Sequence, residues 1–89
     1  MDIHKIKELR AKGKALEPIV HMGKEGLSPN VIAELQRQLK AHKLIKIKIT
    51  KEYFTGKDKK AEAQAIADAV NAELIELVGF VVVLADKRQ

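Results

Sequence analysis

The stretch EPIVHMGKEGLSPNVIAELQRQLKAHKLIKIKITK, residues 17–51, decides the fold. It opens with a short apolar run over residues 17–22, followed by a turn with two glycines and by a helical pattern that begins at Ser28-Pro29. Serine suits the N-cap of a helix, and a proline in the first helical position loses no hydrogen bond. Residues 43–51 then alternate between apolar and polar, as in a strand with one buried face. The stretch therefore predicts a strand, a helix and a second strand.

Helical patterns precede the first strand and follow the glycine turn. Residues 2–15 repeat apolar side chains at helical spacing, and Gly13 is expected to loosen or end that helix. The helix that begins after the turn carries one apolar stripe and should run to about His42.

The C-terminal half predicts a loop, a further helix and a hairpin. Residues 50–58 are expected to form a loop that ends near a glycine, and residues 58–73 form an alanine-rich helical pattern. Residues 74–87 are rich in β-forming side chains and are broken by Gly79, which favours two strands joined in a hairpin.

These elements predict a single compact α/β domain over residues 1–89, in the order α-β-α-β-α-β-β. Alternating strands and helices favour right-handed crossovers with helices packed on the sheet. Because the terminal hairpin adds an antiparallel pair, the four-stranded sheet should be mixed.

Composition excludes several classes of protein. The 89 residues contain no cysteine, which rules out disulfide scaffolds and cysteine-based zinc sites and favours the cytoplasm. No apolar run approaches the ~18 residues that a membrane span needs, and the charged first ten residues do not resemble a signal peptide. The three histidines lack metal-ligand spacing, and no nucleophile lies next to a base, so we expect no metal, no cofactor and no enzymatic activity.

Positive charge is concentrated in one segment. The chain has 17 lysines and arginines against 12 acidic residues, a net charge of +5. Residues 40–60 hold eight lysines and two acidic residues, a net charge of +6, whereas the rest of the chain carries nine basic and ten acidic residues. A local excess of this size favours a face that binds a polyanion.

The glycine turn has two interpretations. A strand that turns into a helix can need glycine for its backbone angles alone. Alternatively, Gly-Lys-Glu-Gly before a helix N-terminus can present N–H groups and an ammonium to a phosphate. The neighbouring lysines favour the second interpretation.

The order of these motifs resembles the CRM domain, the chloroplast RNA splicing and ribosome maturation domain, and its YhbY-like stand-alone members. The residues that carry the resemblance are Leu9-Arg10, Pro18-Ile19-Val20, the GxxG-Leu-Ser run from Gly23, the strand Leu44–Ile49, Val78-Gly79 and Val82–Leu84. Phe80 and Ala85-Asp86 stand where many members have a polar or basic residue and Tyr-Arg.

The resemblance implies a fold similar to the C-terminal domain of the third bacterial initiation factor. It also implies binding of structured RNA through the GxxG loop and the adjoining basic surface, in association with large-ribosomal-subunit precursors or, in plants, group II introns. Separately, we expect a monomer that does not associate with membranes. Transferred by position, the RNA-binding residues are Gly23, Lys24, Glu25 and Gly26 of the GxxG loop and Arg10, Lys46 and Lys48 of the basic surface.

Two other classes remain open. An Alba-like DNA- or RNA-binding chromatin protein shares a related order of elements, although the last hairpin here is short and apolar. A protein–protein adaptor would use its lysines only for solubility and would show no affinity for RNA.

Overall fold

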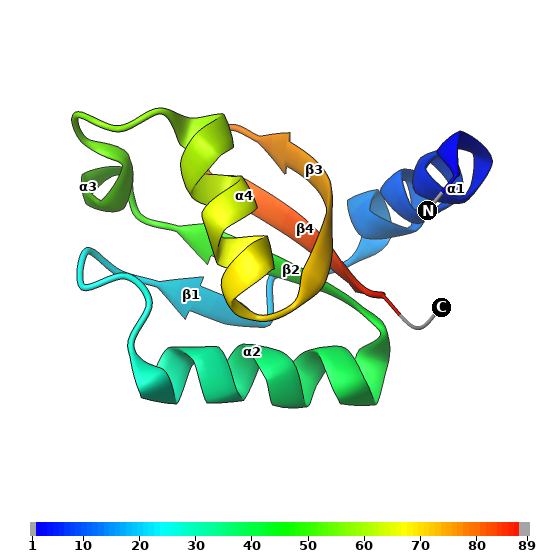
Figure 1. The fold of residues 1–89 in the computed structure, drawn as a ribbon. Helices are drawn as coiled ribbons and strands as arrows, with labels where there is room; N and C mark the ends of the chain where they lie inside the picture. Colours follow the sequence, from blue (N-terminus) through cyan, green and yellow to red (C-terminus); the bar gives the residue numbers. More distant parts are fainter. Residues whose placement is uncertain (1, 88–89) are drawn as a thin grey trace.

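Four strands form one mixed sheet that carries helices on both faces (Figure 1). The computed structural model describes residues 2–87. In chain order the helices and strands are α1 (Ile3–Ala15), β1 (Val20–Met22), α2 (Pro29–His42), β2 (Leu44–Ile49), α3 (Lys51–Phe54), α4 (Lys59–Ala69), β3 (Ala72–Val78) and β4 (Val81–Asp86). The predicted α/β class is confirmed.

The strands lie in the order β1-β2-β4-β3. β1 and β2 pair in parallel, with Val20 opposite Ile47, and α2 forms the crossover between them. β4 lies between β2 and β3 and runs antiparallel to both. The sheet is therefore mixed, as the sequence predicts.

The alternation of β2 separates the two faces of the sheet. Ile45, Ile47 and Ile49 are at most 1% exposed and lie in the larger core, which α2 and α4 cover. Lys46 and Lys48 point to the other face, because successive side chains of a strand alternate between faces.

Helix α1 packs on that second face. Its Leu9 is buried in a smaller core with Ile75, Val83 and Ala85. Gly13 lies inside the helix, where an added Cβ would be 3.1 Å from Cγ1 of Val83. The helix continues two residues beyond Gly13, so Gly13 does not end it. Its missing side chain lets the helix approach β4 closely.

The predicted loop over residues 50–58 contains the short helix α3. Tyr53 and Phe54 are 7% and 5% exposed, since this turn directs both rings into the core. Burial of two aromatic rings is a tertiary effect that the polar composition around them conceals.

Two other boundaries differ from the predictions. The helix predicted over residues 58–73 ends at Ala69, because Asn71 adopts a left-handed φ of 57° and β3 begins at Ala72. β1 begins at Val20 rather than near residue 17, although the Ile19 N–H already donates to the carbonyl of Lys46 at 3.0 Å.

The predicted hairpin is confirmed. β3 and β4 join through Gly79 and Phe80, and Gly79 adopts the left-handed φ of 59° that tight hairpin turns favour. The predicted domain limits, residues 1 and 89, lie outside the described residues. Within residues 2–87 no helix has both the length and the apolar character needed to cross a membrane.

The close approach of α1 predicts a cost for a larger residue at Gly13. Gly13→Leu should lower the free energy of unfolding by about 1–3 kcal/mol, because the side chain would overpack against Val83. The exposed neighbour Ala11 provides the control, and Ala11→Leu should change it by less than about 0.5 kcal/mol. Urea unfolding measures the free energy of unfolding of both variants. Equal values for Gly13→Leu and Ala11→Leu would contradict the close packing of α1 on Val83.

Candidate nucleic-acid interface

The glycine turn follows β1 at the end of the molecule opposite α1 (Figure 1). The Gly26 N–H donates to the Gly23 carbonyl at 3.0 Å and closes the turn. The Thr50 N–H donates to the Met22 carbonyl at 3.0 Å, which fixes the start of the turn to the end of β2. The N–H of Gly26 is thus occupied within the protein and is not free for a phosphate.

The two glycines differ in what they require. Gly26 has a φ of 70°, and a Cβ there would be 2.5 Å from Cε1 of Tyr53. A Cβ at Gly23 would meet only the Oε2 atom of Glu25 at 3.3 Å, the far end of a flexible side chain. The fold therefore explains Gly26, whereas it places no comparable demand on Gly23.

Lys24 and Glu25 form the exposed tip of the turn. The carboxylate of Glu25 lies over Gly23, so the negative charge stays beside the turn. Lys24 forms no ion pair with any other described residue. The tip therefore combines a free ammonium with a carboxylate.

The helix after the turn begins as predicted. The Val31 N–H donates to Oγ of Ser28 at 3.2 Å, and Pro29 is the first helical residue. Since proline has no N–H, the N–H of Asn30 is the first-turn donor left for solvent or a ligand.

Tyr53 connects the glycine turn to α4. Its ring lies beneath Gly26, and its hydroxyl donates to Oε1 of Glu62 at 3.0 Å. Nζ of Lys57 lies 4.3 Å from the ring centre and 4.0 Å from the same carboxylate oxygen. Burial, and then the hydrogen bond and the charge of Glu62, raise the pKa of Tyr53 above its usual value.

A row of side chains crosses all four strands on the α1 face of the sheet. His21 of β1 lies opposite Lys48 of β2, Lys48 opposite Val81 of β4, and Val81 opposite Val78 of β3. His21, Lys48 and Val78 are exposed. We call these four residues the open row; it begins one residue before the end of β1 and so adjoins the glycine turn.

The other two basic residues predicted for the interface lie elsewhere. Lys46 is half-buried one row further along β2, and its Nζ donates to the Leu16 carbonyl at 3.2 Å. Nε of Arg10 donates to the Ile75 carbonyl at 3.1 Å, on the edge strand furthest from β1. Lys48 thus lies beside the turn, Lys46 is set back from it, and Arg10 lies across the sheet from it.

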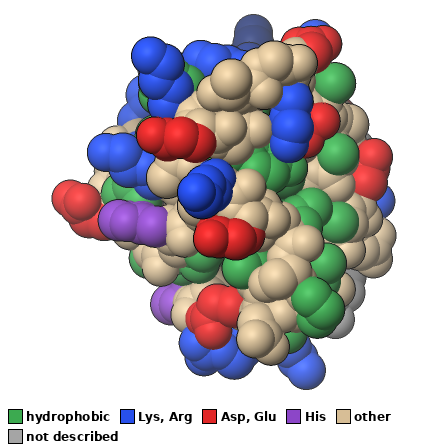
Figure 2. Space-filling view, turned by 90° about the vertical axis from the view of Figure 1, so that its left-hand side faces the viewer, with side chains coloured by type: hydrophobic (Ala, Val, Ile, Leu, Met, Phe, Trp, Pro, Cys, Tyr) green, Lys and Arg blue, Asp and Glu red, His purple; other side chains and the backbone are tan. Residues whose placement is uncertain are grey.

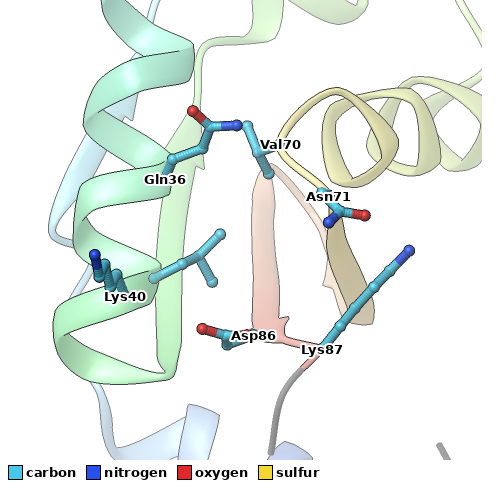
Figure 3. A pocket seen from close by; sticks show the side chains of 7 residues that line it. Gln36, Lys40, Val70, Asn71, Asp86 and Lys87 are labelled. Atoms are coloured by element: carbon cyan, nitrogen blue, oxygen red, sulfur yellow. The ribbon is translucent and has the colours of Figure 1, made fainter.

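The basic segment is also divided in space. Lys40 lies at the end of α2, near the start of β2, and lines a polar hollow with Asp86 and Lys87 (Figure 3). β2 separates this hollow from the glycine turn by about 17 Å. The local charge of residues 40–60 therefore does not form one surface.

The side of the molecule that carries the turn has mixed charge. Figure 2 shows lysine and arginine side chains there interspersed with acidic ones, and apolar side chains exposed between them. Local geometry therefore matters more than net charge on this side.

Some functional features escape prediction from the sequence. Tyr53 and Phe54, the two aromatic residues within the basic segment, are buried and cannot stack on a base. The Phe80 ring stacks on Phe54 at 6.1 Å between ring centres, and Nζ of Lys59 lies 4.1 Å from the Phe80 ring centre and 5.9 Å from that of Phe54. Across the described residues no group of three or more histidine or acidic side chains could hold a metal ion.

Comparisons with known proteins agree with this fold. A sequence model described as the CRS1 / YhbY (CRM) domain matches residues 1–85. A probable RNA-binding protein of Methanocaldococcus jannaschii is 46% identical over 81 residues, which cover 91% of this chain and 60% of that protein. The probable RNA-binding protein YqeI of Bacillus subtilis is 32% identical over 76 residues, which cover 85% of this chain and 77% of that protein.

A solved structure is also similar. The solution structure of a hypothetical protein from Staphylococcus aureus has a TM-score of 0.80 at 27% identity, over 97% of this chain and 88% of that one. The chain spans less than two thirds of the length of the M. jannaschii relative.

The unequal glycines predict unequal effects on stability. Gly26→Ala should lower the free energy of unfolding by about 2 kcal/mol, because alanine is strained at this φ and its Cβ would displace the Tyr53 ring. Gly23→Ala should change it by less than about 0.5 kcal/mol. Urea unfolding of the two variants tests this, and equal losses would show that the packing beneath Gly26 is not what distinguishes them.

The raised pKa of Tyr53 predicts a loss of stability at high pH. The folded state favours the protonated hydroxyl, so the contribution is complete below the usual pKa of 10.0 and is lost as pH rises through the higher folded pKa. Tyr53→Phe should lower the free energy of unfolding by about 1 kcal/mol at neutral pH, because the substitution removes the hydrogen bond to Glu62. As pH rises above the usual tyrosine pKa of 10.0, the free energy of unfolding of the variant should fall less steeply than that of the unmodified chain. Parallel pH profiles would contradict this.

Proposed function

The chain belongs to the CRS1 / YhbY (CRM) domain family. We propose that it binds structured RNA through the glycine turn and through His21 and Lys48, the two residues of the open row that lie beside that turn. The observation that carries the proposal is the position of Lys48. Lys48 is exposed and forms no ion pair with another described residue. It lies opposite His21, and His21 stands two residues before Gly23 in the chain. A phosphate at the turn would thus have an ammonium within reach on either side, from Lys24 and Lys48.

The chemistry of the turn fits a phosphate backbone. Gly23 has no Cβ that would hold a ligand away from the main chain, and α2 directs the positive end of its dipole toward the turn. The carboxylate of Glu25 opposes this attraction, so the site should bind with moderate affinity and strong dependence on salt. Lys46 would add a contact further along the sheet.

We further propose ribosomal RNA of large-subunit precursors as the target, bound by a monomer in the cytoplasm without catalysis. The support is the family membership together with the names of the relatives, which describe RNA binding. RNA duplexes are bound mainly by shape and through their phosphates and 2′-hydroxyls, which suits a turn and lysines with few accessible aromatic rings. Arg10 would contribute only to an RNA that reaches across the sheet.

An Alba-like role finds less support. β3 and β4 are joined directly by Gly79 and Phe80, so the hairpin has no extended basic arm to follow a duplex groove. Preferential binding to duplex DNA would favour that alternative.

The proposal predicts a local effect at Lys48. In the unmodified chain, affinity for a fragment of large-subunit ribosomal RNA should fall steeply with salt, and Lys48→Gln should reduce the slope of log K against log salt by roughly 0.7–0.9, the loss of one phosphate contact. Fluorescence anisotropy measures the slope, with transfer RNA and duplex DNA as competitors.

Lys40→Gln is the matched control, because it removes the same charge at the other end of β2. Its slope should stay within about 0.3 of the unmodified chain. Equal slopes for Lys48→Gln and Lys40→Gln would contradict a binding site located at Lys48. RNA binding that is absent or insensitive to salt would instead favour the protein–protein adaptor.

A further inference from the structure

A hollow of 240 Å³ lies on the α1 face of the sheet, at the end of the open row that Val81 and Val78 form. Its apolar walls are Val78, Val81 and Val83 of the hairpin strands. Polar side chains at its rim are Lys14, Lys46 and Glu76, and Gly13 completes the lining.

The hollow exists because α1 covers only part of this face. Gly13 brings the helix against Val83, but the helix ends at Ala15. Val81, one row further along, is therefore only partly buried, and Val78 is 62% exposed. An apolar surface thus continues from beneath the helix into solvent.

The rim carries uncompensated positive charge. Within residues 2–87, Lys14 and Lys46 form no ion pair, and the one bond of Nζ of Lys46 is to the neutral Leu16 carbonyl. Lys48 of the open row lies opposite Val81. The ammonium groups of Lys14 and Lys46 therefore lie at the rim with the carboxylate of Glu76, and Lys48 lies on the strand beside the hollow.

We propose that this hollow receives the base of one unpaired nucleotide, while Lys14, Lys46 and Lys48 contact the phosphates on either side of it. The proposal rests on the proposed function and assigns single-stranded RNA to a second surface beside the glycine turn. The apolar walls can contact the flat face of a base, and the lysine ammonium groups at the rim can pair with the phosphates that flank that base.

Size and polarity support this occupant. Pockets for whole small molecules usually measure about 300–1,000 Å³, so a hollow of 240 Å³ fits one base better than an independent ligand. Glu76 can accept a hydrogen bond from an exocyclic amino group, as acidic side chains do from N4 of cytosine. Oligocytidine is for this reason the probe of choice.

The first test places a carboxylate at the mouth of the hollow. Val78→Asp should weaken binding of single-stranded oligocytidine about tenfold, since the new charge would face the base and its phosphates. Binding of a perfectly paired RNA hairpin should change less than about twofold, because its bases cannot enter the hollow. Val78 is exposed, so the variant should fold, and circular dichroism checks that it does.

Ile3→Asp is the matched control. Ile3 is 54% exposed and lies about 15 Å along α1 from Gly13. Its substitution by Asp adds the same negative charge as Val78→Asp. It should weaken binding of either RNA less than about twofold. The proposal is overturned if Val78→Asp affects both RNAs equally or affects neither. If the unmodified chain binds neither RNA, the proposed function itself fails.

A second measurement does not depend on tolerance of the new charge. The chain has no cysteine, so Val78→Cys and Ile3→Cys each introduce a single thiol. Saturating oligocytidine should slow the maleimide labelling of the Val78→Cys variant at least about fivefold. It should leave the labelling rate of the Ile3→Cys variant unchanged. Equal labelling rates with and without bound oligocytidine at position 78 would exclude the hollow as the site.

Discussion

The alternation of β2 is the constraint on which the rest of the structure depends. Three isoleucines of this strand are at most 1% exposed in the core beneath α2 and α4, and the lysines between them must face the other way. A slip of one residue against β1 or β4 would bury both lysines and expose the isoleucines. The register is therefore fixed by the hydrophobic effect, and with it the position of Lys48 beside His21 and the glycine turn.

A second consequence is that the two faces of the sheet are covered unequally. Two helices cover the isoleucine face, whereas among the described residues α1 is the one helix on the lysine face, and it ends before it covers Val81 and Val78 near the hairpin turn. Gly13 lets that single helix bury Val83 without extending over Val81. The same packing that builds the smaller core thus leaves an apolar, lysine-rimmed surface open next to the turn. The end of one helix therefore decides how much apolar surface stays exposed on this face.

Local sequence patterns were sufficient for much of the fold. Ser28-Pro29 marks the start of α2, the Lys-Ile alternation marks β2, and Gly79 marks the hairpin, because each depends on nearest neighbours along the chain. Apart from the boundaries of α4 and β1, the errors concern contacts between distant residues. The burial of Tyr53 beneath Gly26 could not be read from the polar segment around it, nor could the approach of Gly13 to β4.

The same limit applies to the candidate site. The GxxG turn and Lys48 could be predicted as neighbours, since parallel strands joined by a crossover helix end at the same edge of a sheet. Arg10 and Lys40 could not be placed, because charge counted along the sequence ignores which end of β2 a residue occupies.

The geometry finally separates two roles that the GxxG pattern combines. Gly26 is accounted for by its backbone angle and by the ring beneath it, so a substitution there disturbs the fold whatever the turn binds. Gly23 has neither constraint, and the atom nearest to its missing Cβ belongs to the carboxylate of Glu25. Because that side chain is exposed and flexible, it can move aside when an anion approaches the main chain at Gly23. If the turn binds an anion as proposed, glycine at this position matters for the ligand rather than for the turn, and Gly23 is the position at which a loss of binding can be separated from a loss of stability.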